Sequence, residues 1–566
     1  MATDPNTEVS TQADTPRPRT LDSMLHRLQV ERDFQGFKEL WTFARAWPPD
    51  AYAISYLLLS SHASYRTAVC TDEVADFQID RGDGPMSKLW PNMAEFSSYV
   101  RTIGAQWRRY ADDVVKATRD NAAPPAAQPT LAAFFAEVEN SLCRLVACAA
   151  DYTDATCQDR AVLFCMSAAA DEACVGLGLP GPAAGSTTWF ALEAELRLVD
   201  IKHGSLSRFS PHAIRVLPKM HTPQRGMTLR SLSHHVCATT QEFGLRWMVP
   251  SSLEDAQERR SHPDERLNLL LFPWPLTVTD QAVRPAPKSL PGPWGYFDWV
   301  PSDPFDVGVL SALLKSAIRR NLTVDGVVLP EASITEPEAE ALFTELDQLD
   351  VKLVLAGIRG EATNAAWLHT PGSFTFEQGK HHRWCLDRGQ IEQYSFQRVL
   401  NPHIQWWENI RLAPRTLGFV ALSSWLTLCH VICEDLARLD PVDQIIRAVG
   451  PNLLIALLQD GPQLRQRWGA RYATVYSDDP GTSVLTLTSK GMAMASRPPP
   501  GGRRRPVVAL WSDPDTGTRE LELEDDAEAL WISICARRVV EFAADGRSDG
   551  GMASRLTLVD HQSIWR

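Results

Sequence analysis

Apolar residues in the first half of the chain recur at intervals of three and four positions, which is the spacing of one face of a helix. The clearest case is the segment LAAFFAEVENSLCRLVACAA at residues 131–150. We therefore expect a mainly α-helical domain over residues 21–260, after a polar tail over residues 1–20. Proline and glycine gather at residues 122–129 and 176–185, and both clusters predict loops between groups of helices.

The pattern changes near residue 267, where short apolar runs begin to alternate with helical segments and turn residues. The predicted strands are the apolar runs at 267–272, 326–329, 352–356, 417–432, 453–458, 483–488, 507–511 and 529–534. Helical spacing occurs between them at 305–321 and 441–449. This alternation is typical of an α/β fold, which we expect over residues 265–545, followed by a C-terminal extension at 546–566.

Composition and charge narrow the classes of function. A chain of 566 residues is too long for one ordinary core, and its 44% apolar and 22% charged residues are typical of folded globular domains. Its formal net charge of -13 argues against a general nucleic-acid-binding role, because acidic surfaces repel phosphate. Residues 201–241 are a local exception, since they carry basic residues and histidines but no Asp or Glu. This segment is either a solvated basic stretch or the binding site of an anionic partner.

The cysteines indicate a reducing compartment, and the amino terminus indicates a protein that is not secreted. The chain has eleven cysteines, an odd number, and no CxxC pair, so neither a disulfide framework nor a zinc ribbon is predicted. The histidine pairs at 234–235 and 381–382 lack a second ligand pair at suitable spacing, so we expect no metal. Residues 1–20 contain no secretion signal, and the most apolar runs, such as 417–433, are too short or too polar to span a bilayer. We expect a cytoplasmic protein that does not enter a membrane.

Three reactive side chains stand at the carboxy ends of strands in the second half, where α/β proteins commonly place their sites. They are Glu331 in DGVVLPEAS, Lys380 in FEQGKHHRW and Cys433 in LCHVICEDLAR. An apolar strand that ends in cysteine puts the thiol on a sharp turn, close to backbone amides that favour the thiolate. A carboxylate can take the thiol proton, and an ammonium can stabilise the oxyanion that forms when a carbonyl or nitrile carbon is attacked. A carboxylate, an ammonium and a thiol together suffice for acyl transfer.

The order Glu, Lys, Cys within LPEA, KxH and ICED resembles the nitrilase, or carbon–nitrogen hydrolase, superfamily. The segments LLIALLQDG and RWGARYATVYSDDPGTSVLTLTS are similar to the strand and helix that follow the cysteine of that family. The resemblance covers roughly residues 265–545. It implies an α-β-β-α sandwich, homodimers or higher oligomers with stacked sheets, and hydrolysis without a metal or cofactor. By this resemblance Cys433 is the nucleophile, Glu331 the base and Lys380 the oxyanion partner.

Members of the family also carry a second glutamate near the lysine. Asp387 and Glu392 are the candidates for this second acid, although neither lies in a motif similar to that of the family. The chain departs from the family pattern in two other respects: Glu434 follows the cysteine where an aromatic residue is common, and the interval from Glu331 to Lys380 is short. These departures leave open a regulated or degenerate domain.

We consider two functions from different classes. The first is a thiol-dependent hydrolase that cleaves a non-peptide carbon–nitrogen bond of a small amide or nitrile through a thioester on Cys433. The second is an interaction or effector protein of a bacterial antiphage system, because KHHRWCLDRGQIEQY and ICEDLARLDP are similar to nitrilase-like domains of antiphage reverse transcriptases. That resemblance draws attention to YADD at residues 110–113, since reverse transcriptases bind metals with a YxDD turn. Its surroundings instead predict an amphipathic helix.

Overall fold

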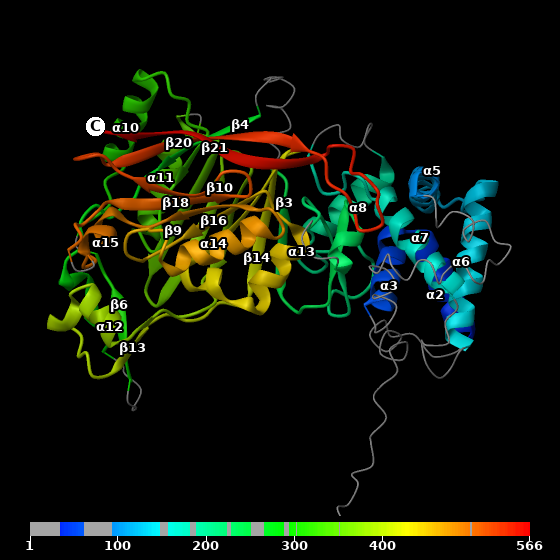
Figure 1. Cartoon of the computed structure of the whole chain (residues 1–566), viewed down its shortest axis with the longest axis horizontal. Coiled ribbons are helices and arrows are strands. Elements are labelled where there is room, and N and C mark those ends of the chain that lie inside the picture. Colours follow the sequence, from blue (N-terminus) through cyan, green and yellow to red (C-terminus); the bar gives the residue numbers. More distant parts are fainter. Residues whose placement is uncertain are drawn as a thin grey trace, which may run out of the picture.

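Figure 1 shows helices at one end of the molecule and stacked β-sheets at the other. The computed structural model describes residues 34–60, 93–147, 157–180, 188–223, 228–250, 265–287, 294–301, 303–349, 351–498 and 501–566. The polar tail predicted for residues 1–20 lies outside the described residues.

The described part of the first 200 residues is helical. Its helices are α2 (Phe34–Arg45), α3 (Pro48–Leu59), α5 (Met93–Arg119), α6 (Pro129–Ala147), α7 (Cys157–Ala173) and α8 (Trp189–Val199). The helix predicted at 131–150 is α6, and residues 122–128 form the expected loop before it. Aromatic residues fill the space between the helices, as where Trp107 and Phe135 pack edge to face with ring centroids 5.3 Å apart.

The YADD sequence at residues 110–113 lies inside α5, as its surroundings predicted. The Oδ1 atom of Asp112 accepts a hydrogen bond from the backbone N–H of Phe190 at 2.9 Å. Phe190 stands in the first turn of α8, where backbone N–H groups lack helical partners and a carboxylate is favourable. Asp112 therefore joins α5 to α8.

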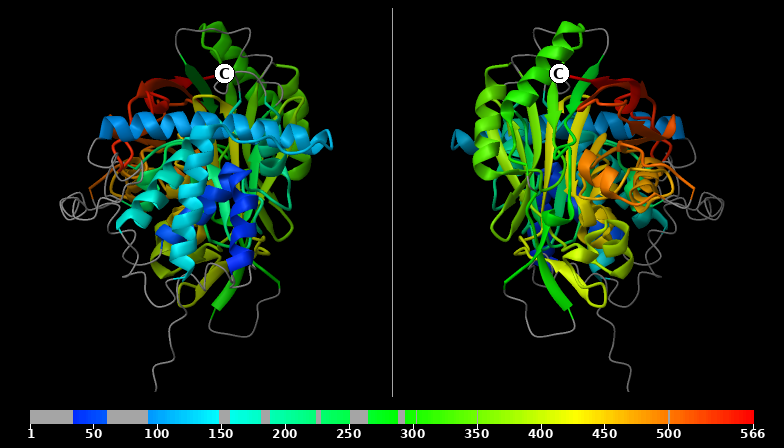
Figure 2. Two further views of the ribbon diagram at one scale, coloured as in Figure 1. Left: turned by 90° about the vertical axis from the view of Figure 1, so that its right-hand side faces the viewer. Right: turned by 90° about the vertical axis from the view of Figure 1, so that its left-hand side faces the viewer.

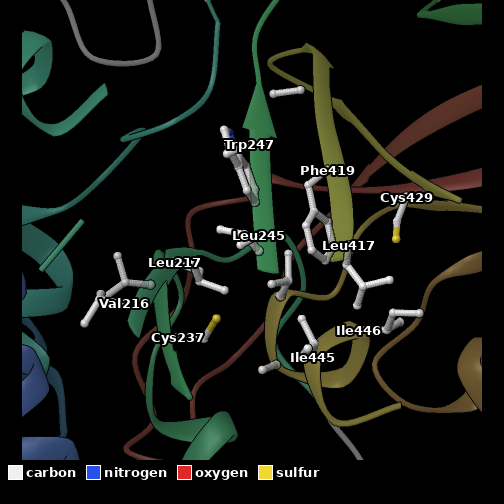
Figure 3. Packing of buried hydrophobic residues seen from close by; sticks show 14 of the residues in the cluster. Val216, Leu217, Cys237, Leu245, Trp247, Leu417, Phe419, Cys429, Ile445 and Ile446 are labelled. Carbon is white, nitrogen blue, oxygen red and sulfur yellow. The ribbon is translucent and has the colours of Figure 1, made fainter. Parts of the chain in front are cut away.

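Three strands follow the helices, within the range predicted to be mainly helical. β1 (Arg215–Pro218) and β2 (Val236–Thr239) pair with each other in an antiparallel ladder. β3 (Gly244–Met248) instead pairs in parallel with β14 (Thr416–Ser423), so residues from the first half complete a sheet of the second half. Figure 3 shows the two strands side by side, with Trp247 stacked on Phe419 at a centroid distance of 5.6 Å.

The first large sheet contains eight strands. Seven run in the order β11-β10-β9-β7-β4-β20-β21, and β8 pairs with β9 beside this path. Their bounds are β4 (Arg266–Leu271), β7 (Gly326–Val328), β8 (Ile334–Thr335), β9 (Leu353–Gly360), β10 (Thr363–Thr370), β11 (Phe374–Gly379), β20 (Ala529–Val539) and β21 (Ala553–Ile564). The apolar runs at 267–272, 326–329, 352–356 and 529–534 correspond to four of them. The predicted C-terminal extension, residues 546–566, contains the edge strand β21.

The second large sheet has seven strands in the order β19-β18-β17-β16-β15-β14-β3. Its remaining bounds are β15 (Leu426–Ile432), β16 (Leu453–Leu457), β17 (Ser483–Leu487), β18 (Val507–Asp513) and β19 (Gly517–Glu522). The single apolar run predicted at 417–432 is two antiparallel strands, because the chain turns between β14 and β15. No glycine or proline marks that turn, which consists of Ser424 and Trp425.

Helices cover the outer faces of both sheets, which gives four layers in the order helix, sheet, sheet, helix (Figure 2, right). α10 (Val307–Arg319) and α11 (Glu336–Asp347) pack on the eight-stranded sheet, and α14 (Trp468–Asp478) packs on the seven-stranded sheet. Alternate residues of β4 show the layering: Leu270 faces the helices, whereas Leu269 and Leu271 face the other sheet. The predicted α-β-β-α arrangement is therefore present in the second half.

A smaller, four-stranded sheet lies at the end of the sandwich remote from the helical half (Figure 1, lower left). Its strands are β5 (Val283–Pro285), β6 (Trp294–Trp299), β12 (Cys385–Leu386) and β13 (Gln405–Glu408). The short helix α12 (Arg388–Gln393) lies between β12 and β13 in the chain.

The loop between β20 and β21, residues 540–552, reaches the helical half and is called the C-terminal arm below (Figure 1, red). Arg547 of the arm is fully buried and donates to carboxylates on both sides of the contact: to Asp545 at 2.7 Å and to Glu172 at 2.9 Å. It also donates to the Leu232 carbonyl at 2.8 Å and to Asp171 at 3.3 Å. The arm thus closes a buried ionic network between the two halves.

Several cations of the basic segment 201–241 are engaged inside the protein. Lys219 is buried and donates to the carbonyl of Ser233 at 2.6 Å, and Arg208 pairs with the buried Asp50 at 2.8 Å. Arg225 lies outside the described residues. In the part of the chain that the structure describes, no helix is both long enough and apolar enough to cross a bilayer.

Candidate active site

Glu331 lies three residues beyond β7, on a tight turn that is packed against β9. The next residue, Ala332, has a φ of 48°, in the left-handed region that a residue with a side chain seldom adopts. The turn can approach β9 because residue 357 is glycine: a Cβ there would lie 2.2 Å from the Pro330 carbonyl oxygen and 2.5 Å from the Glu331 Cα. Glu331 itself is 3% exposed. The backbone of β9 therefore fixes where this carboxylate stands.

Replacement of Gly357 by alanine is expected to push the turn that carries Glu331 outward. Because backbone atoms rather than a flexible side chain block the new methyl group, we expect an activity loss of about 10²-fold and a destabilisation of about 1–3 kcal/mol. Turnover and urea unfolding measure the two effects. Gly389→Ala is the matched control, since a Cβ there meets only Asp387 Oδ1 at an ordinary 3.4 Å. Equal activity of the two variants would show that the close approach at residue 357 does not matter.

Lys380 and Asn364 bridge Glu331 to a second glutamate, Glu408. Lys380 Nζ donates to Glu331 Oε1 at 2.7 Å and to Glu408 Oε2 at 2.6 Å. Asn364 Nδ2 donates to Glu331 Oε1 at 2.8 Å and to Glu408 Oε1 at 2.7 Å. The backbone N–H of Trp384 donates to Glu408 Oε2 at 3.1 Å. We call Glu331, Asn364, Lys380 and Glu408 the carboxylate ring; all four residues are buried.

The charges of the ring set the protonation of its members. Burial alone would lower the pKa of Lys380, but Glu331 and Glu408 raise it well above its usual value, so the ammonium form is retained. Burial raises the pKa of Glu331, and the negative charge of Glu408 adds to this, while Lys380 opposes it. A carboxylate whose pKa is raised takes up a proton more readily, which suits a general base for a thiol.

Cys433 begins the turn η8 (Cys433–Ala437) directly after β15 and has a φ of 44°. The residue is 3% exposed. Burial raises the pKa of this thiol well above its usual value, Glu331 raises it further, and Lys380 and the backbone of Gln459 lower it. The resting thiol is therefore neutral, and a base is needed to form the thiolate.

Asp435 connects the cysteine turn to the segment that follows Lys380. Its Oδ2 accepts from the backbone N–H of His381 at 3.1 Å, and its Oδ1 is 2.8 Å from His382 Nδ1. His381 Nε2 in turn accepts from the backbone N–H of Thr416 at 3.1 Å. His381 and His382 thus connect the end of β11 to the turn after β15 and to the start of β14.

The two acids considered for the second carboxylate lie away from the ring. Asp387 is exposed and caps α12, where its Oδ1 accepts from the backbone N–H of Gln390 at 2.8 Å. Glu392 pairs with Arg388 at 2.9 Å, a residue whose side chain is 69% exposed. The acid that contacts Lys380 is Glu408, which the sequence analysis missed.

The sequence of β13, QWWE, carries no local signal for Glu408, because its two tryptophans are adjacent, and the alternation appears only in the structure. Along Gln405–Glu408 the exposed and buried positions alternate, so Glu408 falls on the same buried face as Trp406. A carboxylate on the buried face of a strand indicates a partnered charge. Glu408 is 28 residues from Lys380 in the chain, whereas Asp387 and Glu392 are its near neighbours in sequence.

A further buried carboxylate, Asp460, acts electrostatically on Cys433. Asp460 follows Gln459 and accepts hydrogen bonds from the Tyr394 hydroxyl, from Arg467 and from Trp468 Nε1. Tyr394 ends α12, so the segment between Lys380 and Glu408 folds back onto the end of β16.

Comparisons with solved structures cover about half of the chain. No protein-family model matches the chain, and no curated protein matches it. An amidase from Nesterenkonia sp. is 11% identical with a TM-score of 0.30, and the alignment covers 49% of this chain and 93% of the amidase. Nit3 of Saccharomyces cerevisiae, a member of branch 10 of the nitrilase superfamily, is 10% identical with a TM-score of 0.30 over 47% of this chain and 89% of Nit3.

XC1258 from Xanthomonas campestris, a CN-hydrolase superfamily protein, is 13% identical with a TM-score of 0.29, and the alignment covers 48% of this chain and 89% of that protein. About half of this chain is similar to nitrilase-superfamily structures. This is the superfamily that the LPEA, KxH and ICED motifs resemble.

Proposed function

We propose that the second half of the chain is a thiol-dependent hydrolase of a non-peptide carbon–nitrogen bond, with a small amide or nitrile as substrate. The observation that carries the proposal is the hydrogen-bond pattern of the carboxylate ring. It leaves one carboxylate oxygen and one ammonium hydrogen unused, and the charges of both groups act on the Cys433 thiol.

The unused oxygen supports Glu331 as the base. Glu331 Oε1 accepts from both Lys380 and Asn364, but Glu331 Oε2 is buried and has no hydrogen-bond partner among the described residues. Both carboxylate oxygens of Glu408 already accept hydrogen bonds, Oε1 from Asn364 and Oε2 from Lys380. Only Glu331 therefore has an oxygen ready to receive the thiol proton, and Glu408 acts as a fixed counter-charge for the lysine.

The unused hydrogen supports Lys380 as the oxyanion partner. An ammonium has three N–H donors, and Lys380 uses one on Glu331 and one on Glu408. The third is available to an oxygen that becomes negative when a carbonyl carbon is attacked. In a buried site such a fixed donor acts strongly, because little water screens it.

The reaction with an amide follows from these two assignments. Glu331 Oε2 takes the proton of the Cys433 thiol, and the sulfur attacks the carbonyl carbon, so that a carbon–sulfur bond forms and the oxygen becomes an oxyanion beside Lys380. The oxyanion then collapses, the carbon–nitrogen bond breaks, and Glu331 returns the proton to the departing nitrogen. The products of this step are an amine and a thioester on Cys433.

Hydrolysis of the thioester regenerates the enzyme. Glu331 takes a proton from water, the hydroxide attacks the thioester carbon, and a second tetrahedral intermediate forms beside Lys380. Its collapse breaks the carbon–sulfur bond, releases the acid, and returns the proton from Glu331 to the Cys433 thiolate.

Replacement of Cys433 by alanine tests the proposal. We expect ammonia or amine release from a panel of small amides and nitriles to fall by about 10⁴-fold or more, because no other group can form the acyl intermediate. Cys429→Ala is the matched control, since Cys429 is a fully buried cysteine on β15, the strand that leads to Cys433, and this variant should keep its activity. Intact-mass measurement should detect a thioester adduct in the wild type alone. Release at the wild-type rate by the Cys433 variant would refute the assignment.

A further inference from the structure

Asn364 contacts every other member of the carboxylate ring. It lies near the start of β10 and is 5% exposed. Its two side-chain hydrogens point to different carboxylates, at 2.8 Å from Glu331 Oε1 and 2.7 Å from Glu408 Oε1. Its backbone carbonyl also accepts from the backbone N–H of Lys380 at 2.9 Å.

We infer that Asn364 is a positioning residue: its amide keeps Glu331 and Glu408 ionised side by side, so that Glu331 stays available as the base. This inference rests on the proposed function. It adds a role for a neutral side chain that touches neither the thiol nor the attacked carbon in the proposed reaction.

The need for such a residue follows from the charges. Two buried carboxylates near one lysine repel each other, and such a pair commonly shares a proton to relieve the repulsion. A proton shared between Glu331 and Glu408 would occupy the base. An amide that donates one hydrogen to each carboxylate stabilises both negative charges and separates the two oxygens. Burial raises the pKa of Glu331, and the hydrogen bond from Asn364 lowers it.

The orientation of the amide supports this role. Asn364 Oδ1 is buried and has no hydrogen-bond partner among the described residues, so the amide is oriented by its two acceptors alone. The opposite orientation would place Oδ1 against two carboxylate oxygens, which is repulsive. An unpartnered buried carbonyl is a cost that the protein carries in order to present both hydrogens to the acids.

The test uses alkylation of Cys433 by iodoacetamide, which needs no knowledge of the natural substrate. The full-length protein is reacted across a range of pH, and the rate at Cys433 is followed by peptide mass spectrometry. In the wild type the rate should rise as Glu331 loses its proton and becomes able to take that of the thiol. Glu331→Gln should remove this rise and leave only the titration of the thiol itself.

For Asn364→Ala we expect the rise in the alkylation rate of Cys433 to move to higher pH by about one unit or more. Without the amide, Glu331 and Glu408 share a proton that is lost only at higher pH. Asn364→Asp preserves the shape but replaces a donor by a third acid, so its shift should be at least as large. Asn268→Ala is the control: Asn268 is another buried asparagine of the same sheet, whose amide bonds Thr323 and Asp325. Its profile should match that of the wild type.

A packing role would leave the Asn364→Asp profile where the wild-type profile lies. The inference would be overturned if both Asn364 variants had the wild-type dependence of alkylation rate on pH while Glu331→Gln still lost the rise in rate. The proposed function would then remain. An unchanged profile for Glu331→Gln would contradict the proposed function itself.

Discussion

Lys380→Met is expected to abolish turnover and to lower the free energy of unfolding by about 3–5 kcal/mol at neutral pH. Methionine keeps most of the side-chain volume but removes the ammonium from between Glu331 and Glu408, whose oxygens lie 2.7 and 2.6 Å from Nζ. Two buried carboxylates then have no cation between them. The same change removes the donor that stabilises the oxyanion, so activity and stability fall together.

The loss of stability in this variant should depend on pH. Without the ammonium, burial and the charge of Glu408 raise the pKa of Glu331 in the folded state further above its unfolded value. The folded state then binds protons that the unfolded state releases, so the destabilisation is complete at neutral pH and is relieved as the pH falls through the raised folded-state value. Urea unfolding at about pH 5 and about pH 8 measures the difference.

Lys352→Met is the matched control for Lys380→Met. Lys352 also pairs with a carboxylate, Asp325, but at 3.5 Å and with 27% of its side chain exposed. A pair of this kind contributes less than about 1 kcal/mol. If the two lysine variants had the same free energy of unfolding at every pH, the charge balance of the carboxylate ring would not be what stabilises it.

Arg547→Met is expected to lower the free energy of unfolding by about 3–5 kcal/mol, because it leaves the carboxylates of the C-terminal arm and of α7 without their cation. Arg547 is fully buried and contacts Asp545, Glu172 and Asp171. The first unfolding transition in urea should move to a lower concentration. Residues 540–552 should also become sensitive to limited proteolysis, since the arm is held to the helical half by this side chain.

Arg537→Met is the control for the arm. Arg537 lies on β20 beside the arm and pairs with Asp515, but 62% of its side chain is exposed. We expect its loss to change the free energy of unfolding by less than about 1 kcal/mol. Arm proteolysis at the same rate in both variants would show that Arg547 does not hold the two halves together.

Glu331 and Cys433 could be found because each follows a predicted apolar strand, whereas Lys380 could be found only through the KxH motif, since β11 was not predicted. The structure brings Glu331 and Lys380 into direct contact, and both act electrostatically on Cys433. Glu408 and Asn364 could not be found in either way. Their place beside Lys380 depends on how β13 and β10 pair with distant strands, and that register is not visible in a local window of sequence.

The strands also divide into those that the sequence predicts and those that it does not. Strands such as β4 and β16 were predictable because both of their faces are buried, which makes them continuous apolar runs. β10 and β11 were missed because polar residues interrupt them. β3 was missed because its alternating, five-residue pattern lies within a region dominated by helical spacing, and its assignment to a sheet is decided by its contact with β14.

The pairing of distant strands has a consequence for how the chain reaches this structure during synthesis. β3 stays without its partner until β14 has been made, and β4 lacks one neighbour until β20 appears near the end of the chain. Contacts of such long range form slowly, and unpaired strand edges invite aggregation while they wait. The nascent protein therefore completes neither sheet until β14 and β20 have both been made, and unpaired strand edges persist until then.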